Sequence, residues 1–146
     1  MMRPELWALA AAALWAVGSF FGKRGMSTAG LAPEQGLVVR LAVSTTVLIL
    51  LAAPKLLALA RALGTADGRR GIGQIALWEG LAAGALGMLA FYIALKRGEL
   101  SRVVPLAFTT PLWGFLLGVA VAGEAMTPTK VGGVVAILVG IVLLNL

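Results

Sequence analysis

The sequence predicts an all-α integral membrane protein with five transmembrane helices. Its 146 residues are 60% hydrophobic and 12% charged, whereas an ordinary soluble domain is about 25% charged. Its apolar residues also fall into five runs, each close to the roughly 20 residues that a helix needs to cross a bilayer. The runs are Leu6–Gly22, Gly36–Ala53, Gly71–Leu95, Val103–Gly123 and Val131–Leu146.

The connectors between the runs set the expected helix ends. The first connector contains Gly30 and Pro33, which break helices. A leucine-rich stretch continues the second helix to Leu63, and residues 64–68 then form a turn. Ser101 is the expected N-cap of the fourth helix and Thr127, followed by Pro128, that of the fifth. We therefore expect one domain, residues 1–146, with helices at about 6–22, 36–63, 71–95, 103–123 and 128–146.

The composition excludes several classes of function. The chain has neither cysteine nor histidine, so it has no thiol nucleophile, imidazole base or usual transition-metal ligand. Because it also has no paired carboxylates inside a span, we expect no enzyme activity, metal or cofactor. The net charge of +6 does not indicate nucleic-acid binding, since the basic residues stand in pairs at the ends of apolar runs.

Lysine and arginine are balanced between the two sides of the membrane. Six lie on the side of the N-terminus (Arg3, Lys55, Arg61, Arg69, Arg70, Lys130) and six on the other (Lys23, Arg24, Arg40, Lys96, Arg97, Arg102). Orientation normally follows an excess of these residues on the cytoplasmic side. The balance favours insertion in both orientations with pairing into an antiparallel dimer; a single orientation, N-terminus inside, is the alternative.

Several motifs stand in the order of a known family. They are Ala13–Phe20, Arg40 at the start of the second helix, Leu89–Lys96, Pro105–Leu112, Gly123–Pro128 and Val131–Val142. Together they resemble the EamA domain of the drug/metabolite transporter superfamily. The resemblance implies a transporter of small metabolites. Members commonly carry two such domains as inverted repeats around a cavity, so a chain with one domain implies a dimer, in which an inverted repeat requires antiparallel copies.

Glu79 is the strongest candidate for a functional residue, because it is the only carboxylate inside an apolar run. An ionised side chain at that depth costs about 2.5–3.5 kcal/mol on insertion scales, so it normally faces a cavity or a partner. Glu79 is thus a candidate for binding substrate or carrying a proton. The alternative is that the third helix starts later and Glu79 lies at the membrane surface beside Trp78.

Arg40 is the second charged candidate, four residues into the apolar run of the second helix. One interpretation is that its side chain extends to the lipid headgroups. In an antiparallel dimer, however, Arg40 of one copy comes to the membrane face of Glu79 in the other, which allows an ion pair between subunits.

Uncharged residues complete the expected cavity. Trp15, Tyr92, Thr109 and Trp113 lie inside apolar runs, where a polar cavity would provide hydrogen-bond partners. Packing alone is the alternative for the three aromatic residues, and a hydrogen bond from the hydroxyl back to an earlier backbone carbonyl is the alternative for Thr109. Pro111 removes a backbone hydrogen bond in the fourth helix and is a candidate hinge.

Small residues mark the expected dimer contact. Gly132, Ala136 and Gly140 form a stripe of small residues four apart in the last helix, a pattern that lets membrane helices pack closely. Glu124 is expected to neutralise the turn before this helix, near Lys130.

These observations predict a secondary transporter of small metabolites or cationic or zwitterionic compounds. It would work as a dimer by alternating access in the inner cell membrane, with proton coupling through Glu79 as an option. Its expected partners are the bilayer, the substrate and a second copy, not nucleic acid. The alternatives are a flippase for a lipid-linked headgroup and a membrane partner subunit that does not transport.

Overall fold

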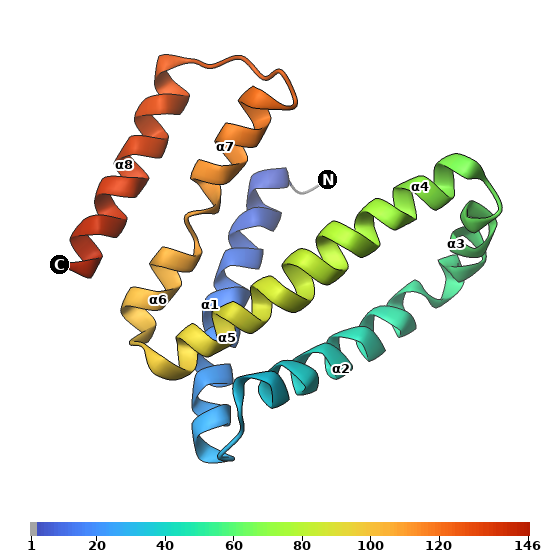
Figure 1. Ribbon diagram of the computed structural model, residues 1–146, viewed down its shortest axis with the longest axis horizontal. Helices are drawn as coiled ribbons and strands as arrows, with labels where there is room; N and C mark the ends of the chain where they lie inside the picture. Colours follow the sequence, from blue (N-terminus) through green and yellow to red (C-terminus); the bar gives the residue numbers. More distant parts are fainter. Residues whose placement is uncertain (1–2) are drawn as a thin grey trace. The chain divides into compact units, whose positions relative to one another are not determined.

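The computed structural model describes residues 3–146, which are helical throughout apart from short connectors (Figure 1). Five of its helical stretches are long and apolar enough to cross a membrane, so the prediction of an all-helical chain with five membrane-spanning helices is confirmed. These spans are Pro4–Thr28, Pro33–Leu63, Ala66–Arg97, Leu100–Ala120 and Pro128–Asn145. All five begin earlier than the apolar runs, because each helix extends into its polar flank; only for the last, at Pro128, does the expected helix start agree with the structure.

The chain forms two compact units. One unit joins the chain up to Phe21, which includes most of helix α1 (Pro4–Thr28), to Arg97–Leu146. The other is the continuous segment Gly22–Lys96.

The unit Gly22–Lys96 is built around an antiparallel helical hairpin (Figure 1). One arm is α2 (Pro33–Ala52), a 3₁₀ turn η1 (Ala53–Lys55) and α3 (Leu56–Leu63). The return arm is α4 (Ala66–Gln74), a π-helix η2 (Ile75–Gly87) and α5 (Met88–Arg97). The outgoing arm changes to 3₁₀ at Pro54, which cannot donate a backbone hydrogen bond within the helix.

The turn of this hairpin is tighter than the sequence indicates. Only Gly64 and Thr65 separate α3 from α4, whereas residues 64–68 were expected to form the turn. The reason is that the Thr65 hydroxyl accepts a hydrogen bond from the Gly68 amide at 3.1 Å and starts a new helix at once. The basic pair Arg69–Arg70 therefore lies on α4 and not in a connector.

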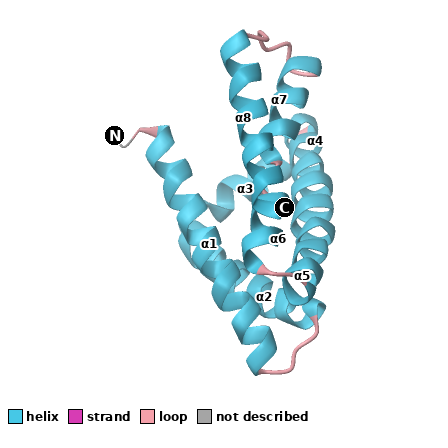
Figure 2. Cartoon of the chain, turned by 90° about the vertical axis from the view of Figure 1, so that its left-hand side faces the viewer, coloured by secondary structure: helices cyan, strands magenta, loops and turns pink. Residues whose placement is uncertain are grey.

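The other unit carries α6 (Leu100–Ala107), α7 (Thr110–Ala120) and α8 (Pro128–Asn145). Helix α8 packs against α6 and α7, and Figure 2 shows it beside α7. Thr127 caps α8 as predicted, since its hydroxyl accepts from the Lys130 amide at 3.3 Å. The prediction for α6 is wrong by two residues: the helix follows Glu99, and Ser101 already lies within it.

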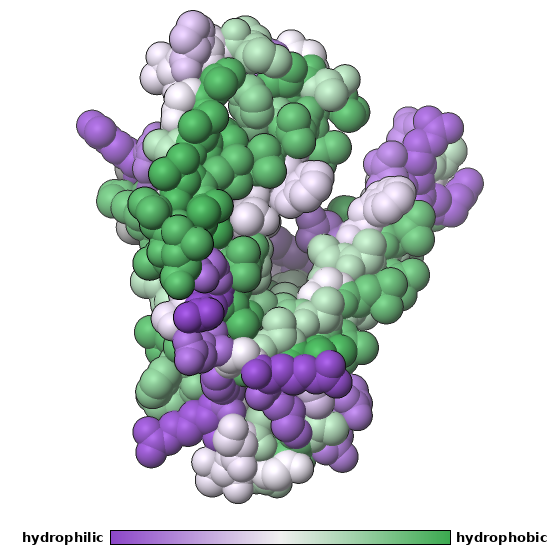
Figure 3. Space-filling model, turned by 60° about the vertical axis from the view of Figure 1, so that its left-hand side comes forward, coloured by the Kyte–Doolittle hydropathy of each residue, from purple (hydrophilic) through white to green (hydrophobic). Residues whose placement is uncertain are grey.

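Very few side chains of the described chain are buried. The buried hydrophobic residues are Met26, Leu37, Tyr92, Leu95 and Ile141, and Ser19 is the buried polar one. Hydrophobic residues cover much of the face in Figure 3. A water-soluble fold would bury its large hydrophobic residues in a core. Here most of them are exposed, as expected of a chain surrounded by lipid or by further helices.

Candidate functional site

The core of the unit Gly22–Lys96 surrounds the only tyrosine of the chain. Tyr92 on α5 is 7% exposed and packs with Met26 at the end of α1 and with Leu37 on α2. In this cluster the end of α1, helix α2 and helix α5 meet. It therefore fixes the position of the α5 face that carries Tyr92.

Arg40 on α2 reaches the same face of α5. Its Nη1 atom lies 3.3 Å from the Met88 Sδ atom, and its Cζ atom lies 6.0 Å from the centre of the Tyr92 ring. Met88 and Tyr92 are four residues apart on α5 and so share one side of the helix. Two residues of the predicted cavity, Arg40 and Tyr92, are thus brought together, and Met88 joins them.

The half-buried Arg40 guanidinium makes no ion pair with any residue from 3 to 146. The described salt bridges join Arg102 to Glu99 and Lys130 to Glu124. A thioether is a weak acceptor and a tyrosine ring offers only the negative face of its π-system. The positive charge of Arg40 is therefore not neutralised within the described chain.

The Tyr92 hydroxyl also has no hydrogen-bond partner among the described residues, although its ring contacts Phe91 and Arg40. Every fully enclosed side-chain nitrogen or oxygen of the described chain has a partner. The hydroxyl oxygen is therefore not fully enclosed, even though the tyrosine is buried.

Two glycines lie against this tyrosine. A Cβ atom at Gly22 would lie 3.6 Å from the Tyr92 hydroxyl oxygen, and one at Gly36 would lie 3.4 Å from Cε1 of its ring. At Gly36 it would also come within 2.7 Å of Met26 Cγ, so Met26 already occupies the place of a side chain there. Gly36 therefore allows Met26 to pack beside the tyrosine.

Lys96, at the end of α5, binds the connector between α1 and α2. Its Nζ atom donates to the backbone carbonyl of Leu31, in the connector between α1 and α2. The same connector is held by the Gln35 side chain, which accepts from the Ala32 amide at 2.8 Å. Lys96 is therefore committed to a backbone oxygen, whereas Arg40 is not.

Glu79 lies inside the third span, which begins at Ala66. The helix thus starts before Glu79 rather than after it. Its side chain is exposed and makes no ion pair with a described residue, Arg40 included. It belongs to the π-helix η2, a rare helix type that is often found at functional sites.

The remaining cavity candidates lie in the other unit. The Trp15 ring stacks on Phe108 with centroids 5.7 Å apart, and Thr109 follows where α6 ends. Trp113, on the first turn of α7, is 60% exposed. Thr109 thus lies in the interruption between α6 and α7, and Trp15 contacts this interruption through Phe108.

The fourth span is interrupted just before Pro111. Helix α6 ends at Ala107, and α7 begins at Thr110 with the proline in its first turn. A proline cannot donate to the carbonyl four residues earlier and its ring clashes with that group. The break is therefore where the sequence predicts a kink.

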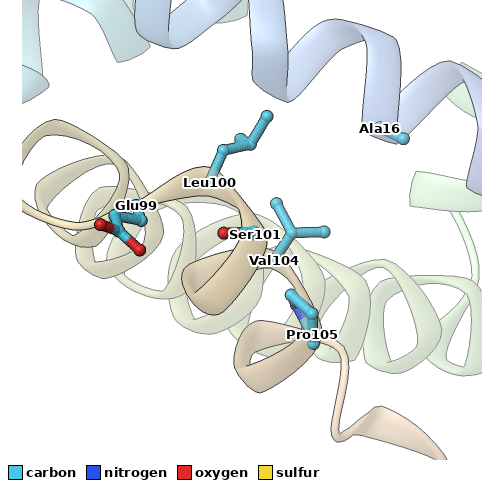
Figure 4. A pocket seen from close by; sticks show the side chains of 6 residues that line it. All are labelled: Ala16, Glu99, Leu100, Ser101, Val104 and Pro105. Atoms are coloured by element: carbon cyan, nitrogen blue, oxygen red, sulfur yellow. The ribbon is translucent and has the colours of Figure 1, made fainter. Parts of the chain in front are cut away.

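A shallow hollow of about 570 Å³ lies between α1 and the start of α6. It is lined by Ala16, Glu99, Leu100, Ser101, Val104 and Pro105 (Figure 4). Its lining is mostly apolar, and Glu99 is paired with Arg102 at 3.3 Å. None of the predicted cavity residues lines this hollow.

The small-residue stripe of α8 lies open. Gly132 and Ala136 are exposed and Gly140 is half-buried, and no atom of the described chain lies within 4 Å of a Cβ placed at either glycine. At the start of the helix, the predicted pairing of Glu124 is confirmed: its Oε2 atom lies 3.2 Å from Lys130 Nζ.

Met88 is the residue of this site that sequence reasoning missed. A methionine in an apolar run is typical of a lipid-facing or core position, so the residue type does not indicate a functional site. Its spacing of four residues from Tyr92 was the available signal, because it places both side chains on one helical face. Nothing in the sequence shows that this face meets Arg40.

Comparison with known proteins identifies the family of the chain. The model of the EamA-like transporter family matches residues 2–146, which is essentially the whole chain and confirms the single-domain prediction. No curated protein and no solved structure matches the chain. With this match and its five apolar spans, the chain is a multi-pass membrane protein that belongs to the EamA-like transporter family.

Proposed function

We propose that this chain is a secondary transporter of small metabolites, cationic or zwitterionic ones in particular, that works as a homodimer by alternating access. The observation that carries the proposal is the combination of a family match over the whole chain with only five spans. An odd number of spans leaves the termini on opposite sides of the membrane. Two copies inserted in opposite directions would therefore build an inverted repeat, the arrangement in which transporters bind substrate near the midplane.

The small buried core supports assembly with a second copy. In each span the most hydropathic window is at most 6% buried. Such helices leave wide surfaces for another chain as well as for lipid. The open stripe of Gly132, Ala136 and Gly140 on α8 is the proposed contact, because small residues let helix backbones approach closely in lipid. The balanced charges favour antiparallel copies, and we propose the inner membrane as their location.

Glu79 and Arg40 are the proposed charged groups of the transport pathway, with Trp15, Tyr92, Thr109 and Trp113 as further lining residues. Glu79 would bind the cationic part of a substrate or carry the coupled proton, since an acid inside a membrane span is normally functional. In the antiparallel dimer, Arg40 and Glu79 of opposite copies would lie toward the same membrane face. The break before Pro111 would serve as the hinge.

A flippase for a lipid-linked headgroup is the second candidate. The observation that favours it is the apolar hollow at Leu100 and Val104, which could hold a lipid chain beside the polar groups of Ser101 and Glu99. We rank it second because the residues of the proposed pathway lie outside this hollow.

Transport by the reconstituted protein tests the proposal. Proteoliposomes on a solid-supported membrane are exposed to a panel of amines, amino acids, nucleosides and sugar phosphates, and charge movement is recorded. We expect substrate-induced currents in the wild type that Glu79→Gln abolishes. Glu5→Gln, a matched loss of a carboxylate in the first turn of α1, should leave them intact. A dimeric protein that responds to no compound, or a Glu79→Gln variant with normal currents, contradicts the proposal and favours a partner subunit.

A further inference from the structure

We propose that Arg40 and Tyr92 form a binding site for an anionic oxygen group, a carboxylate or a phosphate. The proposal deepens the function proposed above by naming the chemistry of one bound group. It rests on that function only for the identification of the molecule that carries this group as a transported substrate. Among the substrates proposed above, it favours zwitterionic ones over purely cationic ones.

The first argument is that the site offers donors and no matching acceptor. Arg40 carries five N–H groups in a fixed fork, and the structure gives it only the Met88 thioether and the Tyr92 ring. The Tyr92 hydroxyl, on a side chain 93% buried, donates to no described residue. Carboxylate and phosphate oxygens are the acceptors that match a guanidinium fork, because they accept two parallel hydrogen bonds.

The second argument is electrostatic. Arg40 lies in the second span, where an unpaired charge is costly and normally has a partner. The carboxylates of its unit are Glu34 on the first turn of α2, Asp67 on the first turn of α4 and Glu79 on η2; none of them forms an ion pair with a described residue. A negative charge that pairs with Arg40 must therefore come from outside the described chain.

The third argument concerns access. The Tyr92 hydroxyl oxygen is not fully enclosed, and its neighbour Gly22 adds no side chain there: a Cβ at Gly22 would lie 3.6 Å from this oxygen. Lys96, four residues further along α5, donates to the Leu31 carbonyl and is not a free competitor for the anion. The site thus offers one charged and one neutral donor.

The group could belong to a soluble substrate or to the phosphate of a lipid headgroup. Both use the same contacts, a bidentate guanidinium with support from the hydroxyl. The two sources differ in whether the anion binds from water or only from a bilayer, and this difference can be measured.

Tyr92 provides a reporter because it is the only tyrosine. The full chain is labelled with 3-fluorotyrosine, purified in maltoside detergent, which contains no phosphate, and followed by ¹⁹F NMR. Inorganic phosphate and acetate are titrated at constant ionic strength with chloride. The labelled protein is also transferred to phosphatidylglycerol nanodiscs. Binding at equilibrium needs no turnover, so a chain that transports nothing can still show it.

We expect a saturable shift of the single resonance. Arg40→Gln should weaken binding by about tenfold to a hundredfold, the range for loss of a charged hydrogen bond. Arg40→Lys, which keeps the charge without the fork, should lie between it and the wild type. Arg61→Gln, an exposed charge loss on α3, is the matched control and should change nothing. By calorimetry, Tyr92→Phe should weaken binding by about two- to tenfold.

The two arms separate the sources. A response to free phosphate or acetate in detergent assigns the site to a soluble ligand. A shift that depends on Arg40 and appears only in nanodiscs assigns it to a lipid phosphate. The proposal is overturned if neither arm gives a shift, or if Arg40→Gln responds as the wild type does. It is also overturned if anions bind only after Glu79→Gln, because Glu79 of a second copy would then be the partner of Arg40.

Discussion

The Nη1 atom of Arg40 lies 3.3 Å from the Sδ atom of Met88, so a guanidinium within a membrane span has a thioether as its nearest acceptor. Such a contact leaves most of its donors unused. It also joins α2 to α5 beside Tyr92, at the core of the unit Gly22–Lys96. Structure and candidate function therefore depend on the same few side chains, and changes there should affect both.

Gly36→Ala should destabilise this core. The added Cβ would lie 2.7 Å from Met26 Cγ and 2.8 Å from its sulfur, and Met26 is only 3% exposed. Overpacking of this kind typically costs about 1–3 kcal/mol, reduced to the extent that the flexible methionine can move. Thermal unfolding in detergent should show a lower midpoint. Gly73→Ala, where no atom lies within 4 Å, should leave the midpoint unchanged or raise it.

Gly84→Ala should disturb the π-helix η2. A Cβ at Gly84 would lie 2.7 Å from the Glu79 carbonyl oxygen, which is backbone and cannot move aside alone. A π-helix has more residues per turn than an α-helix and is shorter for the same sequence. The substitution should therefore lengthen the segment as it becomes α-helical.

The length of η2 can be measured by electron-spin distances between labels at Ala76→Cys and Ala90→Cys, both exposed positions. Gly80→Ala is the matched control, because its Cβ would lie 3.8 Å from the Ile75 carbonyl, an ordinary contact. Identical distances in the Gly84→Ala and Gly80→Ala proteins would show that the glycine is not what maintains the π-helix.

Pro111→Ala should slow transport without weakening binding. Alanine restores an N–H group that can bond the carbonyl of Ala107 and join α6 to α7. A hydrogen bond worth about 1 kcal/mol in one conformation would slow turnover by about fivefold. Amide hydrogen exchange at residues 108–112 should slow in parallel. Faster or unchanged turnover together with slower exchange would remove the hinge role.

Ala136→Leu should weaken the dimer. Ala136 is the central residue of the small-residue stripe on α8, and a larger side chain there would hold two helices apart. A penalty of about 1–3 kcal/mol corresponds to roughly a five- to hundredfold weaker association. Energy transfer between labelled copies in vesicles measures it. Val135→Leu, one residue away from the stripe, should have little effect; equal effects of both would place the contact elsewhere.

The sequence was sufficient for the broad architecture and for a few helix ends. Hydrophobic runs of bilayer length predict the five spans, because a helix satisfies its own backbone hydrogen bonds in lipid without a partner segment. Thr127 with Pro128 predicts the start of α8, and Pro111 predicts the break in the fourth span. These features are local, so short stretches of sequence determine them.

The contacts between helices could not be predicted. In a soluble helix the polar face shows which side is buried, but a membrane helix is apolar on all sides. Nothing therefore distinguished the face of α5 that carries Met88 and Tyr92 from its other faces. The π-helix η2 also has no sequence signature, because its glycines permit that geometry without requiring it. Glu99 and not Ser101 is the N-cap residue before α6. A residue type that favours the N-cap position therefore does not fix a helix start by itself.

The topology of the chain in intact cells tests the central claim most directly. The chain has no native cysteine, so single cysteines at Gly30, between α1 and α2, and at Thr65, between α3 and α4, can each be labelled from outside with an impermeant maleimide. The antiparallel dimer predicts that each position is labelled in part from outside and in part only after the cells are permeabilised. If each position labels from one side alone, and the two from opposite sides, the chain has a single orientation and the antiparallel homodimer is contradicted.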